Sequence, residues 1–157
     1  MNQLLCFEMY TRQQASEIRR NFWTRFGQYM RPIPGAEGEF INWLNYKTGV
    51  KHLYFRMDAD RNEAAVSVEI THPDPEERKE FYKKLIALKT IFNETTGEDW
   101  SWQESAADDH GREISRISKT LTGVNIFKTE DWPAIISFLK PRIQALDQFW
   151  DQVKDHF

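Results

Sequence analysis

The chain has 157 residues, of which 40% are hydrophobic and 29% charged, and this composition is typical of one globular domain with its own core. Its net charge of −3 differs from the basic balance of proteins that bind nucleic acid chiefly by neutralising phosphates. The single cysteine, Cys6, excludes an internal disulfide and a cysteine-rich zinc site.

The beginning of the chain has neither a basic start nor a sustained apolar run, so it does not resemble a signal peptide. No stretch approaches the roughly 18 apolar residues of a membrane span. We therefore expect a cytoplasmic protein that does not contact membranes. We expect residues 1–9 to form a peripheral segment and residues 10–157 to form a single domain, and either Met1 or Met9 is the start of translation.

The first helix is predicted from Thr11 to about Met30. Thr11 and Gln14 have the spacing of a capping box, in which two side chains satisfy free backbone N–H groups at the helix start. An apolar stripe with three- and four-residue spacing follows, formed by Ala15, Ile18, Phe22, Phe26 and Tyr29. A loop rich in proline and glycine ends the helix, and residues 39–46 fit either a short strand or one helical turn.

A β-hairpin is predicted next, because apolar residues alternate with polar ones on both sides of the polar tract 58–62. The alternating apolar residues are Leu53, Phe55 and Met57 on one side and Val66, Val68 and Ile70 on the other. If the two apolar faces coincide, three pairs lie opposite each other: Tyr54 with Glu69, Arg56 with Ser67, and Asp58 with Ala65.

A second helix is predicted from Asp74, with Pro75 in its first position and Gly97 as its stop. Residues 99–104 are then expected to form a strand with Trp100 and Trp102 on one face. Residues 108–111 have the composition of a turn. The segment 112–121 fits helix by its apolar spacing and strand by its Ser, Thr and Ile content, and we interpret it as a strand that pairs with 99–104.

The last helix is expected from Thr129 or Asp131 to about Asp155, with a kink or break at Pro141. The elements follow the order α, an optional β, β, β, α, β, β, α. This order predicts an α+β fold: a single domain with a largely antiparallel sheet of about four to five strands and three helices.

No known catalytic or cofactor-binding motif occurs in the chain. The four histidines share no metal-ligand spacing with one another or with Cys6. We therefore expect no metal and no cofactor, and the sequence favours a protein without enzymatic activity.

An alternative follows from the order of the elements, which resembles the core of the PD-(D/E)XK nucleases. Asp58 and Glu69 are the nearest match to the acidic residues of that family, and Thr71 stands where the family has lysine. The expected hairpin register places Asp58 and Glu69 four residues apart, about 13 Å, which is too far for both to ligate one cation. The alternative is therefore a divergent and inactive nuclease-like protein, with His52, Glu69, Thr71 and Glu39 as its polar site.

Two sets of surface residues are further candidates for binding. Arg12 and Arg19 share a face of the first helix with Arg20 beside them, and they either contact nucleic acid or only solvate the helix. Trp23 and Phe149 lie beside the apolar stripes of their helices, and they either pack within the chain or form an interface with a protein partner or a second copy.

Several segments together resemble a bacterial family of domains of unknown function, over nearly the whole chain from Met9 onwards. The segments are 22–30 (Phe-Trp-x-x-Phe-Gly-x-Tyr-Met), 41–49, 55–59, 69–72, 131–133 and 140–146. Members occur alone or behind a restriction-endonuclease-like domain, so the resemblance implies an accessory role near nucleic-acid processing or defence, with no catalytic residues to carry over. We expect a non-catalytic binding or interaction module, either homodimeric or bound to a protein partner.

Overall fold

The computed structural model describes residues 11–157, so the predictions for residues 1–9 and for Met9 lie outside the described residues. In this part of the chain the helices are α2 (Arg12–Met30), α3 (Pro75–Ala87), α4 (Lys89–Thr96) and α5 (Trp132–Val153). The strands are β1 (Leu53–Ala59), β2 (Glu63–Ile70), β3 (Ser101–Ala107) and β4 (Glu113–Thr122). Three short 3-10 turns complete the described elements: η1 (Trp43–Asn45), η2 (Thr129–Asp131) and η3 (Lys154–His156).

The strands form one antiparallel sheet in the order β1-β2-β4-β3, which confirms the predicted α+β fold. The β1–β2 register pairs Tyr54 with Glu69, Arg56 with Ser67 and Asp58 with Ala65, as the alternation of apolar residues predicts. The segment 112–121 is a strand paired with β3, so this interpretation is also confirmed.

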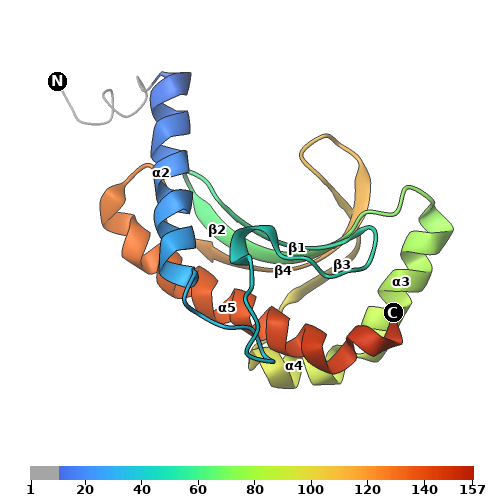
Figure 1. Cartoon of the computed structure of the whole chain (residues 1–157). Helices are drawn as coiled ribbons and strands as arrows, with labels where there is room; N and C mark the ends of the chain where they lie inside the picture. Colours follow the sequence, from blue (N-terminus) through green and yellow to red (C-terminus); the bar gives the residue numbers. More distant parts are fainter. Residues whose placement is uncertain (1–10) are drawn as a thin grey trace.

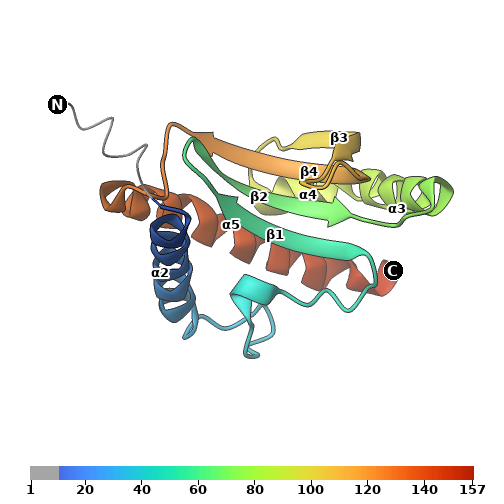
Figure 2. The ribbon, with the colours of Figure 1, turned by 90° about the horizontal axis from the view of Figure 1, so that it is seen from above.

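The helices cover one face of this sheet. α5 runs beneath the sheet and packs against β1 and β2, α3 packs against β2 and β4, and α4 packs against α5 (Figure 1). The apolar side chains of the hairpin, including Leu53, Phe55, Val66 and Val68, are buried on this side. Viewed from above, no described helix covers the opposite face of the sheet (Figure 2).

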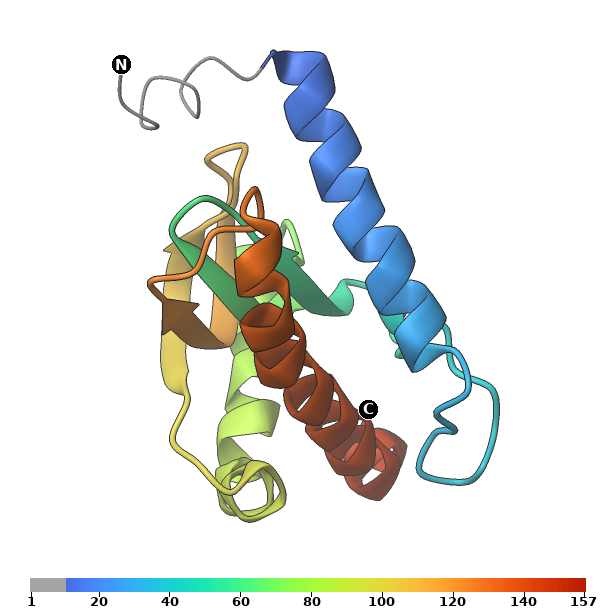
Figure 3. The same cartoon turned by 90° about the vertical axis from the view of Figure 1, so that its left-hand side faces the viewer.

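Helix α2 packs on this body mainly through its C-terminal half. Its buried residues are Phe22, Phe26 and Met30, while its N-terminal half stands apart from the sheet (Figure 3). The capping box of Thr11 and Gln14 is present, as predicted.

A glycine near the end of α2 allows a close contact with the next segment of the chain. A Cβ on Gly27 would lie 2.9 Å from the Cδ1 of Leu44, so the glycine lets η1 approach the helix closely.

Of the two alternatives for residues 39–46, the structure has the helical turn, as the 3-10 turn η1, and no strand. One expectation about the other elements needs correction, and the break considered at Pro141 is absent. The predicted helix 74–96 divides at Leu88, whose φ of −102° and ψ of 10° end α3 before α4 begins. α5 continues through Pro141 without a break, because this proline is exposed and the carbonyl that lacks a partner can bond to water.

The division at Leu88 places Phe92 at the centre of an aromatic cluster. Its ring, which is 0% exposed, lies 5.2 Å from Trp100, 5.3 Å from Trp102 and 5.0 Å from Phe149, measured between ring centroids. The two tryptophans therefore share one face of their segment, as predicted. Edge-to-face contacts of this kind add to the burial of the rings, and they join α4, β3 and α5.

Replacing Phe92 with alanine should lower the free energy of unfolding by about 3–5 kcal/mol, because the deleted ring leaves a cavity between three aromatic neighbours. The matched control is Phe40→Ala, since the Phe40 side chain is 74% exposed. Urea unfolding, monitored by circular dichroism, gives the free energy of unfolding of both variants. Equal losses in the two variants would contradict the central place of Phe92.

Candidate binding groove

The uncovered face of the sheet is hollowed into a groove with a volume of about 670 Å³. Its floor consists of the outward-facing side chains of β1, β2 and β4, which are mostly polar. Residues 44–46, around η1, form one wall, and residues 108–110 of the β3–β4 hairpin form the other.

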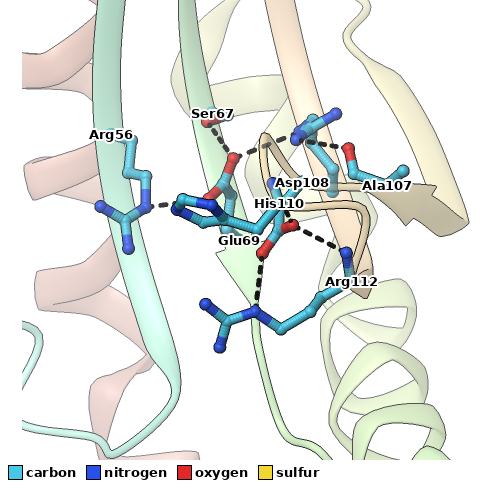
Figure 4. A network of polar contacts seen from close by, with 8 residues as sticks. Arg56, Ser67, Glu69, Ala107, Asp108, His110 and Arg112 are labelled. Atoms are coloured by element: carbon cyan, nitrogen blue, oxygen red, sulfur yellow. Dashed lines mark hydrogen bonds and ion pairs between the residues drawn. The ribbon is translucent and has the colours of Figure 1, made fainter.

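Glu69 lies at the centre of the floor and pairs with arginines from both neighbouring strands (Figure 4). Its Oε1 is 2.8 Å from the Nε of Arg56, and its Oε2 is 3.2 Å from the Nε of Arg116. Ser67 donates a further hydrogen bond of 3.4 Å to Oε2. Because the Glu69 side chain is only 12% exposed, this network links β1, β2 and β4 and occupies both oxygens of the carboxylate.

The hairpin wall is shaped by Asp108, whose carboxylate accepts the backbone N–H groups of His110 and Arg112 at 2.9 and 2.8 Å. The bond from Arg112 is the main reason why the pKa of Asp108 is lowered. Gly111 completes the turn with a φ of 76°, which favours glycine. Arg116 also donates to the Ala107 carbonyl at 3.3 Å, so the wall is tied to the floor.

The opposite wall is anchored from below by Asp147 of α5, which is 5% exposed. Its carboxylate accepts the hydroxyl of Tyr46 at 2.5 Å and the backbone N–H of Ala36 at 2.8 Å. Burial, followed by the hydrogen bond to Asp147, raises the pKa of Tyr46 well above its ordinary value. A second anchor is the indole of Trp150, which donates to the Thr48 carbonyl at 3.0 Å.

Negative charge exceeds positive charge in the groove, because six carboxylates and only two guanidinium groups line it. Both guanidinium groups pair with Glu69, whereas the carboxylates of Glu63 and Asp109 form no hydrogen bond or ion pair within residues 11–157. Burial raises the pKa of Asp58, and the charge of Asp109 on the hairpin raises it further. Unneutralised negative charge therefore lies on the floor, at Glu63 of β2, and on the hairpin wall, at Asp109.

The structure separates the residues of the nuclease-like alternative. Glu69 and Thr71 line the groove. The Thr71 N–H donates to the His52 carbonyl at 2.9 Å, but the His52 ring packs 4.7 Å from that of His72, and the Glu39 carboxylate lies against Gly35 in the loop after α2. Glu69 contacts arginines rather than a second carboxylate. Within residues 11–157, no three His, Cys, Asp or Glu side chains are placed to hold a metal ion. The four residues therefore do not assemble into one site.

The two predicted interface residues differ in burial. Phe149 is 1% exposed, so of the two alternatives it packs within the chain and is not an interface residue: the break at Leu88 turns α4 against α5, and Phe92 covers this ring. Trp23 is partly buried against Phe22 and Phe26, with ring centroids 5.0 and 6.0 Å away. Its role at an interface stays a prediction.

The three predicted nucleic-acid contacts also divide. Arg19 donates to the Ala59 carbonyl at 3.1 Å and lies 3.8 Å from Asp58, so the body of the domain holds its guanidinium. Arg12 and Arg20 are exposed and form no ion pair within the described residues. Contact with nucleic acid stays a prediction for these residues.

Sequence reasoning missed the two groups that build the walls of the groove. Asp147 had a signal, because a carboxylate next to Leu146 in the apolar stripe of the last helix indicates a buried partner. The residues Asp108 to His110 were identified only as a turn, since a turn sequence does not say over which face the hairpin bends.

Replacing Asp147 with alanine should lower the free energy of unfolding by about 2–4 kcal/mol, because the buried Tyr46 hydroxyl and the part-buried Ala36 N–H lose their acceptor. The control is Asp151→Ala, one turn along the same helix, where the carboxylate pairs only with Lys154 at 3.4 Å and should contribute at most about 1 kcal/mol. The measurement is thermal and urea unfolding, with limited proteolysis of residues 31–50. A stable Asp147→Ala variant with a protected loop would show that Asp147 does not hold this wall.

No described helix is both long enough and apolar enough to cross a membrane. No curated protein and no solved structure matches the chain. A family model described as "Domain of unknown function (DUF4268)" matches residues 18–154. This match confirms the expected kind of family, while bacterial origin and fusion to nuclease-like domains stay predictions. The chain belongs to the DUF4268 family of domains of unknown function.

Proposed function

We propose that this domain is a protein-recognition module that binds a cationic polypeptide segment in the groove over the sheet. The observation that carries the proposal is the open sheet face, in which carboxylates outnumber guanidinium groups by six to two and both guanidinium groups are already paired. A lysine or arginine side chain entering this groove would meet the free carboxylates of Glu63 and Asp109.

The shape of the groove favours a polypeptide over a small molecule. Pockets for small ligands are usually enclosed and lined mainly by apolar side chains, whereas this groove is an open sheet face with a polar floor. Leu44 and Tyr54 add exposed apolar surface at the η1 side, with 43% and 40% of each residue exposed. The aliphatic stem of a long cationic side chain can pack on such a surface while its charged end reaches a carboxylate.

The charge of the groove disfavours nucleic acid as its ligand, because phosphates would be repelled by the free carboxylates and would compete with Glu69 for the arginines. An accessory role near nucleic-acid processing, which the family resemblance implies, would then operate through contact with a protein partner in the cytoplasm. Electrostatic complementarity of this kind directs the choice of partner and the rate of association more than it sets affinity.

A peptide of alternating lysine and alanine should bind the domain at low ionic strength, and the same peptide with glutamate in place of lysine should not. Asp109→Lys should weaken binding of the lysine peptide roughly tenfold, because it replaces an attraction with a repulsion worth about 1.4 kcal/mol. Isothermal titration calorimetry measures the binding of the two peptides and the dissociation constant of the lysine peptide for the Asp109→Lys variant.

The matched control is Glu94→Lys, which makes the same change of net charge on α4, on the covered side of the sheet. If this variant loses as much affinity as Asp109→Lys, the peptide responds only to net charge and the groove is not its site. Binding of the glutamate peptide or of a DNA duplex at the groove would also contradict the proposal.

A further inference from the structure

The N-terminal half of α2 projects above the same face of the sheet that carries the groove (Figures 1 and 3). Within the described residues Ala15, Ile18 and Arg19 of this half are partly buried, and its other residues are exposed. A helical end of two or three turns is marginally stable in water unless it packs against something. This half of α2 therefore has the features of a docking element.

This helix is also the most basic of the described elements. It contains four arginines and a single acidic residue, Glu17, which accepts a hydrogen bond from Gln13. Arg19 is held by the Ala59 carbonyl, and Arg25 lies over the ring of Trp132 at 5.5 Å. The guanidinium groups of Arg12 and Arg20 remain available on the projecting half.

We propose that the groove accepts the N-terminal half of α2 from a second copy of this chain. In the resulting symmetric dimer, each copy places this half of α2 in the groove of the other. The proposal rests on the proposed function, because it names the cationic segment that the groove binds. Arg12 and Arg20 of one copy face the carboxylates of Glu63 and Asp109 in the other.

The placement of the two elements suits a two-fold axis. The projecting helix and the groove lie on the same side of the sheet, so a second copy turned by 180° can form both contacts at once. Each contact then counts twice in the free energy of association. A dimer of this kind also covers the exposed side chains of Leu44 and Tyr54 at the η1 wall.

A second copy fits this helix better than nucleic acid does. Two available guanidinium groups neutralise few phosphates, and the net charge of −3 opposes the approach of a polyanion to the rest of the domain. The groove instead offers carboxylates that lack partners, in the same chain and at the same concentration as the helix.

The test uses charge reversal on both sides of the contact in the full chain. Arg12→Glu/Arg20→Glu should raise the dimer dissociation constant roughly ten-thousandfold, as should Glu63→Lys/Asp109→Lys, because each variant carries two reversals in each of the two equivalent contacts and each reversal contributes about tenfold. Sedimentation equilibrium at low salt measures the dissociation constant, and far-UV circular dichroism checks that each variant is folded. The control Arg31→Glu/Lys79→Glu makes the same change of net charge as Arg12→Glu/Arg20→Glu, at exposed residues outside the groove, and should leave the dimer intact.

Mixing the two variants provides the decisive result. The acidic helix of the first variant fits the basic groove of the second, and the unchanged basic helix of the second fits the unchanged acidic groove of the first. An equimolar mixture should therefore form a heterodimer of about wild-type affinity, which a merely destabilised variant could not do. The lysine–alanine peptide should dissociate the wild-type dimer, because it competes for the groove.

Three results would overturn the exchange of helices. They are a wild-type chain that stays monomeric at low salt, a dimer that neither double variant weakens, and a mixture of the two variants that fails to associate.

The proposed function is tested separately with the Arg12→Glu/Arg20→Glu variant, whose groove is free. Binding of the lysine–alanine peptide to that variant, together with a monomeric wild-type chain, would retain the cationic ligand and reject the second copy. Loss of DNA binding in the same variant, with no dimer in the wild type, would assign the arginines to nucleic acid.

Discussion

The burial of apolar side chains on one face of the sheet is the constraint on which the rest of this structure depends. Leu53, Phe55, Val66 and Val68 all point toward α5, so the helices that complete the core must lie on that side. Because strand side chains alternate, the same residues force Arg56, Ser67 and Glu69 onto the opposite face. The groove is thus a consequence of how the core is built, and its floor cannot change register without exposing the core.

What makes this face a groove rather than a flat surface is a small number of polar contacts between distant parts of the chain. Asp147 holds the η1 wall through bonds to residues 101 and 111 positions away in the sequence. Arg116 joins the hairpin wall to the floor while it pairs with Glu69. Such contacts cost desolvation and add little net stability, but they decide where each wall stands. The shape of the groove therefore depends on a few buried polar groups, whereas the fold depends on the aromatic core.

This difference explains what could be predicted from the sequence. The register of β1 and β2 follows from the alternation of apolar and polar residues, which is the same on both sides of the turn. The caps of α2 and α3 follow from side chains within a few residues of the helix ends. The break at Leu88 was not predictable in this way, because it serves the packing of Phe92 against Trp100 and Phe149. The groove was predicted only in part: Glu69 and Thr71 were identified from the hairpin, but the residues that form the walls come from a turn and a loop. Their positions depend on contacts that no local pattern encodes.

The distribution of charge shows why net charge alone was a poor guide to binding. The net charge of −3 disfavours a polyanion as a partner of the whole domain. This value is a sum, however, and does not show that a basic helix and an acidic groove lie on one side of the sheet. The arginines of the body near the groove already have partners within it: Arg19 pairs with Asp58, and Arg56 and Arg116 share the carboxylate of Glu69. The charges without partners within residues 11–157, on Arg12, Arg20, Glu63 and Asp109, are of opposite sign and lie in separate parts of the fold. Charges of opposite sign that remain apart within one chain are satisfied most simply between two chains, since the approach of a second copy neutralises both sets at once.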